Sequence, residues 1–96
     1  MEKKVIKNLR IEARRWFQKT YGNTYHSVIV YVNDETLHNN FAYGYDDHFL
    51  QTAKALLENA GYDMKLKDGE HFGTYHLREV LHGVYFVSDV ARKKDL

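Results

Sequence analysis

The side chains best able to do chemistry in this sequence are six histidines and two adjacent carboxylate pairs. His71, His76 and His82 fall in one region, but His76 and His82 are six residues apart, whereas zinc ligands sharing a helix face are three or four apart. The pairs Asp34-Glu35 and Asp46-Asp47 fall at a predicted turn and a predicted helix start, where carboxylates have structural roles. The sequence therefore predicts no metal site, no cofactor and no enzymatic activity.

A second set of side chains is suited to binding rather than to catalysis. It combines rings, which can anchor a protein interface or stack nucleic-acid bases, with polar groups that can surround them. The predicted binding residues are Arg14, Trp16, Gln18, Tyr25, Ser27, Ile29, Tyr31 and His38. We expect the aromatic members and Ile29 to be the buried anchors of an interface, with Arg14 and His38 as the polar surround.

A predicted β-hairpin positions these binding residues. Residues 9–20 and 25–32 are rich in β-branched and aromatic side chains, and Gly22-Asn23 between them suits a two-residue turn of type I′ or II′. A turn this short leaves no freedom to slip, so it sets the strand register. The register predicted in this way pairs Trp16 with Ile29.

A third strand is predicted over residues 35–45, after a tight turn at Asn33-Asp34. The predicted pairs are Val30 with Leu37 and His26 with Phe41. Because side chains alternate along a strand, these pairings sort the residues onto two faces. The face opposite the binding residues holds Ala13, Phe17, Val28, Val30, Val32, Leu37 and Phe41. We expect this face to pack on a helix, and a bulge near Asn39-Asn40 would change the third-strand assignments.

An amphipathic helix is predicted over residues 49–60, with Asp46 or Asp47 as its cap and Gly61 as its stop. Its apolar stripe consists of Phe49, Leu50, Ala53, Leu56, Leu57 and Ala60. Residues 62–73 are mostly polar and are expected to form a mobile loop.

A short second helix is predicted over residues 74–82, from a Thr74 cap to a stop at Gly83. Its apolar positions are Tyr75, Leu77, Val80 and Leu81. A last strand over residues 84–90 completes the order βββααβ. We therefore predict an α+β fold in a single domain, residues 1–96, in which an antiparallel sheet of about four strands packs on one amphipathic helix.

The composition narrows the possible partners and compartments. A net charge of +1 favours neither a strongly basic nucleic-acid-binding surface nor an acidic DNA mimic. The chain has no cysteine and no long apolar run, which predicts a protein of the cytoplasm without a membrane span or signal peptide.

Three functions remain open for the predicted binding residues. In the first, they contact a protein partner or a second copy of the chain, which would make a homodimer. In the second, the rings stack the bases of single-stranded nucleic acid. In the third, an oligomer sequesters a nucleotide-like signal. The set could also be covered by the second helix, in which case it belongs to the fold.

Parts of the sequence also resemble a group of small accessory proteins of bacteriophages and prophages. The resemblance is carried by the pattern RRWFxKTYGNTYHS at residues 14–27, by Val-Tyr-Val at 30–32, by Tyr-Gly-Tyr at 43–45 and by the closing pattern DVxRKKDL at 89–96, where x is any residue. It brings no activity with it, and implies a setting in which short proteins bind a host macromolecule. Host defence machinery, as with an anti-CRISPR inhibitor, is one such target.

Overall fold

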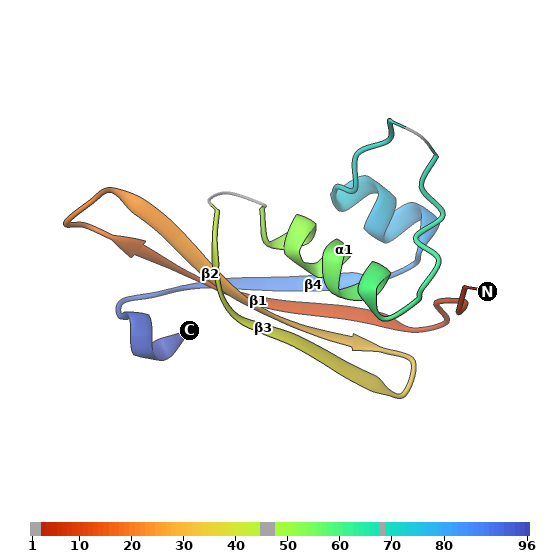
Figure 1. The fold of residues 1–96 in the computed structure, drawn as a ribbon, viewed down its shortest axis with the longest axis horizontal. Helices are drawn as coiled ribbons and strands as arrows, with labels where there is room; N and C mark the ends of the chain where they lie inside the picture. The colour runs from red at the N-terminus through yellow and green to blue at the C-terminus, as the bar shows by residue number, and fades with distance from the viewer. Residues whose placement is uncertain (1–2, 45–47, 68) are drawn as a thin grey trace.

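The chain forms a mixed four-stranded sheet with one helix, α1, packed on one of its faces, as the computed structural model shows (Figure 1). The structure describes residues 3–44, 48–67 and 69–96. In order, the elements are β1 (Leu9–Gln18), β2 (Asn23–Val32), β3 (Glu35–Tyr43), α1 (Phe49–Asn59), the π-helical turn η1 (His76–Val80), β4 (Val84–Val90) and the 3₁₀ turn η2 (Lys93–Asp95). The α+β class predicted from the sequence is confirmed.

The sheet has the strand order β3-β2-β1-β4, and its last pair departs from the prediction. β1 with β2 and β2 with β3 are antiparallel, but β4 runs parallel to β1. Parallel neighbours need a crossover connection, and here the chain passes through α1 and η1 before it returns. The prediction of a wholly antiparallel sheet is therefore wrong for β4.

The first hairpin turn is longer than predicted. β1 ends at Gln18 and β2 begins at Asn23, so residues 19–22 form the loop, and Trp16 lies opposite Tyr25 instead of Ile29. Gly22 adopts φ 69° and donates its N–H to the Gln18 carbonyl at 2.8 Å, which a residue with a Cβ would do less easily. The register differs from the prediction by an even number of residues, so every side chain keeps its predicted face.

The second hairpin confirms the predicted turn and places a bulge in the sheet. Val30 pairs with Leu37 as predicted, but the register shifts between His26 and Val28, so that His26 lies opposite Ala42. The predicted pairing of His26 with Phe41 is wrong for this reason. Phe41 also leaves its predicted face, because its ring stacks on Tyr25 on the opposite side of the sheet.

Helix α1 supplies the core on the covered face, and it ends as predicted. Phe49, Leu50, Ala53 and Leu57 are buried against the valines of β2, and Leu56 is only partly buried. Gly61 at φ 90° ends the helix in a Schellman motif. Its N–H donates to the Glu58 carbonyl, and the N–H of Tyr62 donates to the Leu57 carbonyl. The predicted caps Asp46 and Asp47 lie outside the described residues.

The connection after α1 is packed more tightly than its polar composition suggested. Tyr62, Met64 and Phe72 are buried in the core, and His76 donates its Nε2–H to the Met64 carbonyl at 2.6 Å. The second helix begins at Thr74, as predicted, but ends at Val80 and consists mostly of the π-helical turn η1. Tyr75, predicted to be apolar and inward, is 76% exposed, so that assignment is wrong.

The candidate binding face of the sheet

The sheet face opposite α1, which we call the open face, brings together all eight predicted binding residues. Direct cross-strand partners share a face, and the observed pairs include Arg14 with Ser27, Trp16 with Tyr25 and Ile29 with His38. Gln18 and Tyr31 follow by alternation along the same strands. η1 packs on the α1 side, so it does not cover this face (Figure 1). In the described part of the chain, residues 92–96, the tail, fold onto the open face instead.

One end of the open face is an aromatic ladder, formed by Trp16, Tyr25, Phe41 and Tyr43. The Trp16 and Tyr25 rings stack with centroids 5.7 Å apart, and the Tyr25 and Phe41 rings stack at 4.7 Å. Tyr43 meets the edge of Tyr25 at 5.5 Å, and the Lys93 ammonium lies 4.9 Å from the centre of the Phe41 ring. Tyr25 is therefore stacked on two other rings, and Phe41 contacts both Tyr25 and the tail.

The other end of the open face is organised by Arg10. Its guanidinium lies 5.1 Å from the centre of the Phe86 ring and 5.9 Å from that of Tyr31, so it contacts rings from both neighbouring strands. Arg10 also forms an ion pair with Glu12 at 3.4 Å. Tyr31 and Phe86 remain 39% and 55% exposed, so this end is an apolar surface with the Arg10 guanidinium at its centre.

Between the two aromatic ends lies a polar hollow of about 360 Å³. Its middle is a row across the sheet in which Arg14 has Ser27 on one side and Ser88 on the other. The small serine side chains leave the space, and Leu96 of the tail contributes to its lining. Arg14 donates from Nη1 to the carbonyl oxygen of Asp95 at 3.0 Å, which ties the tail to the sheet.

The exposed anchors differ in part from those predicted. Trp16 and Tyr25 are half-buried within the ladder, whereas Ile29 and Tyr31 are exposed as an interface requires. The open face also presents exposed apolar residues that the sequence reasoning missed, namely Phe41, Tyr43, Val84 and Phe86. The alternation within β4 could have identified Val84 and Phe86, but Phe41 reached this face only through the bulge.

The open face is supported from behind by a buried histidine. His26 projects from β2 toward α1, where its ring forms hydrogen bonds with the Gly44 carbonyl at 3.2 Å through Nδ1 and with the Thr52 hydroxyl at 2.6 Å through Nε2. Burial lowers the pKa of His26 below its usual value. The hydrogen bond with Gly44 raises this pKa in part, and the nearby His48 lowers it further. A neutral ring donates to Gly44 and accepts from Thr52, which locks β2 to the helix.

Charged groups away from the open face have structural roles. Lys4 bonds Glu35 at 2.7 Å and lies over the Tyr62 ring, and the Tyr62 hydroxyl donates to the same carboxylate. These bonds, led by the one from Lys4, lower the pKa of Glu35. They fasten the N-terminal segment to the start of β3 and the end of α1, and they form no cleft with the binding residues.

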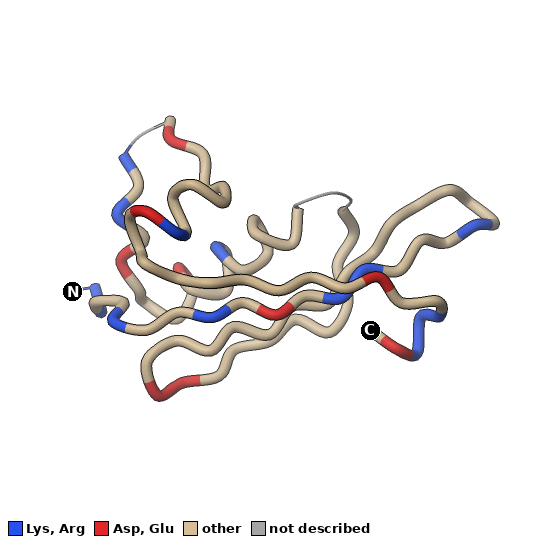
Figure 2. The backbone as a smooth tube through the Cα atoms, turned by 180° about the vertical axis from the view of Figure 1, so that it is seen from behind, with Lys and Arg blue, Asp and Glu red and all other residues tan. Residues whose placement is uncertain are grey.

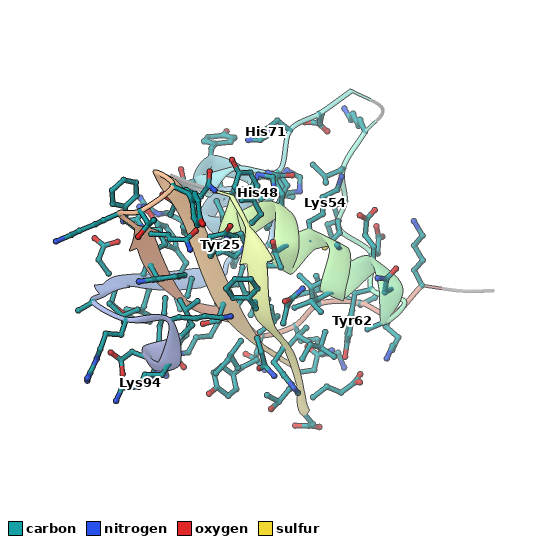
Figure 3. The ribbon with its side chains drawn as sticks, turned by 60° about the vertical axis from the view of Figure 1, so that its left-hand side comes forward. Tyr25, His48, Lys54, Tyr62, His71 and Lys94 are labelled. Carbon is teal, nitrogen blue, oxygen red and sulfur yellow. The ribbon has the colours of Figure 1, made fainter. Side chains whose placement is uncertain are left out.

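Metal and membrane sites find no support within residues 3–44, 48–67 and 69–96. No group of three or more His, Asp or Glu side chains there is placed to hold a metal ion. Within the same ranges, no helix is long and apolar enough to cross a lipid bilayer. Figure 3 places His71 and Lys94 on opposite sides of the sheet, so the histidine-containing connection and the basic tail do not share a surface.

Charges of both signs are spread along the backbone. Figure 2 shows basic positions at the N-terminal end, along β1 and in the tail, with acidic positions between them. No continuous basic path follows the described strands, so the electrostatic field of the open face is mixed.

Comparison of the chain with protein-family models, curated proteins and solved structures finds no match.

Proposed function

We propose that the protein is a non-enzymatic binding protein whose open face contacts a partner protein. The main support for this proposal is a set of apolar side chains that are exposed on that one face, namely Ile29, Tyr31, Phe41, Tyr43, Val84 and Phe86. Exposed apolar patches on soluble proteins mark interaction sites, and here one lies on each side of the polar hollow. The hollow and its Arg14 add the polar centre that such interfaces use for orientation.

The ring geometry favours a protein partner over single-stranded nucleic acid. Base stacking requires a free ring face, but Tyr25 has Trp16 and Phe41 stacked beside it, and Phe41 also meets Lys93. At the other end, Arg10 lies over the rings of Tyr31 and Phe86. Ring edges and apolar surface are what the face offers, and these suit packing against protein side chains.

The biological partner we propose is a host protein or protein complex in the cytoplasm. This follows from the resemblance of residues 14–27 and 89–96 to phage and prophage accessory proteins, which act inside a bacterial cell. An inhibitor of host defence, such as an anti-CRISPR protein, is consistent with a small chain whose described residues offer an interface and no arrangement of catalytic groups.

Comparative co-purification from bacterial host cells tests this proposal. The wild type, Tyr31→Glu on the open face and Tyr75→Glu on the opposite side are each used as bait, since both tyrosines are exposed in the free protein. We expect a specific protein to be captured by the wild type and by Tyr75→Glu and to be lost with Tyr31→Glu. Capture that is equal for all three baits, or a ligand released by moderate salt and nuclease, contradicts binding of a protein by this face.

A further inference from the structure

The two edges of the sheet differ in how they are protected against pairing with another strand. The β3 edge is interrupted by the bulge, and the Asn39 side chain accepts the N–H of Phe41 at 3.0 Å. β4 forms the other edge and pairs with β1 in an unbroken register from Val84 to Val90. Bulges, lysines and prolines are the usual protection of an edge strand, and β4 has none of them.

The backbone on the outer side of β4 is open. Its sequence, VYFVSDV, contains one charged residue, Asp89, and that carboxylate is engaged by Arg15 of β1 at 3.0 Å. Among the described residues, β4 forms backbone hydrogen bonds with β1 alone. Figures 1 and 2 show β4 at the edge of the sheet farthest from β3, with its long side facing outward. Such a row of free N–H and C=O groups is a template for another strand.

We propose that β4 pairs with β4 of a second copy of the chain, antiparallel about a two-fold axis at Val87. The pairing joins two four-stranded sheets into one continuous sheet. The opposed residues are Val84 with Val90, Tyr85 with Asp89, Phe86 with Ser88 and Val87 with itself. The pairing uses the backbone edge of β4, whereas the proposed partner contacts side chains of the open face, and Val84 and Phe86 lie where the two surfaces meet. The pairing does not depend on the proposed function.

The symmetry and the side chains select this register. A two-fold axis normal to the sheet keeps the open face of both copies on one side, so only residues of like alternation can lie opposite each other. Centring on Val87 is the register that pairs all seven residues of the strand. A shift centred on Asp89 would oppose two carboxylates, which destabilises a strand pair. The Val87 register instead opposes each Asp89 to a tyrosine.

The pairing also accounts for the exposed apolar residues nearest the edge. Val84 and Phe86 project from β4 on the open face at 50% and 55% exposure, and the two-fold places each beside a strand of the other copy. An edge of seven residues is small beside the roughly 800 Å² per partner of a typical stable interface, so we expect a concentration-dependent dimer.

Sedimentation velocity over a range of concentrations tests the association. The wild type is expected to approach twice its mass of 11.4 kDa at high concentration. Phe86→Lys/Ser88→Lys, which opposes lysines across the axis, should remain monomeric, whereas the matched change on the other edge, Thr36→Lys/His38→Lys, should associate as the wild type does. Circular dichroism confirms that each variant is folded.

Cysteine cross-linking tests the register without charge changes, because the chain has no native cysteine. In the proposed register, Phe86→Cys of one copy lies opposite Ser88→Cys of the other, within disulfide reach. Each introduced cysteine is offset by two residues from the same cysteine in the second copy. A mixture should give mostly the mixed disulfide. A protein that is monomeric at all concentrations overturns the proposal. So does cross-linking in which the mixed disulfide is no more abundant than the disulfides of each variant with itself. A dimer that is lost with Tyr31→Glu but kept with Phe86→Lys/Ser88→Lys overturns it as well.

Discussion

The two faces of the sheet contain apolar residues from the same strands, but the residues serve different ends. On the covered face, the side chains of β2 meet Leu50 and Leu57 of α1 and are fully buried. On the open face, Ile29 and Tyr31 of the same strand remain exposed. The difference is the presence of a helix on one side, and it separates residues that stabilise the fold from residues that are free to bind.

The largest expected effect is on the covered face. Leu57→Ala removes a side chain with no exposed surface and should lower the free energy of unfolding by about 2–5 kcal/mol, the usual cost of a core Leu→Ala change. Tyr31→Ala on the open face should change it by only about 0.5 kcal/mol. Urea denaturation of both variants measures the contrast, and equal losses would mean that the open face is internal to an obligate assembly.

Binding should show the reverse order. Once the partner is identified, Tyr31→Ala is expected to weaken its affinity by about 2 kcal/mol or more, roughly thirtyfold, because exposed aromatic anchors dominate interface energies. Tyr75→Ala, which removes an exposed ring from the opposite side, is the matched control. Isothermal titration calorimetry supplies both affinities, and a loss confined to the control would transfer the site to the other side of the molecule.

Local patterns were sufficient to predict the faces but not the arrangement around them. Alternation assigned Trp16 and Tyr31 to one side correctly even though the turn was wrong, because the register error was even. The bulge that moves Phe41 and the parallel direction of β4 depend on contacts between distant segments, which no local period encodes. The tail that meets Arg14 is likewise a long-range contact, between residues far apart in the chain.

The aromatic ladder lies between these two extremes, and a smaller effect is expected there. Trp16 is half-buried and stacks on Tyr25, so Trp16→Ala should reduce both stability and partner binding. A double-mutant cycle of Trp16→Ala with Tyr25→Ala should give a coupling of about 0.5–1.5 kcal/mol in unfolding free energy, typical of a ring pair. A coupling of zero, measured by urea denaturation, would show that the ladder is not formed in solution.

The smallest effect on stability at neutral pH is that of His26 protonation, and this effect grows on acidification. Its pKa in the fold is below the unfolded value of 6.5, because burial disfavours the charged ring. Well above pH 6.5 both states are neutral at this position, so its titration does not affect stability. Below it the unfolded state binds the proton more readily, so stability falls until the pH passes the lower pKa of the fold.

The measurement is the free energy of unfolding between pH 7 and 5 for the wild type, His26→Gln and the exposed control His71→Gln. His26→Gln should be less stable at pH 7, because it disturbs the bonds to Gly44 and Thr52, but its loss on acidification should be smaller than that of the wild type. The control should keep the wild-type slope. If all three slopes agree, the acid sensitivity arises elsewhere, and the His26 hydrogen bonds hold β2 to α1 without making the sheet responsive to pH.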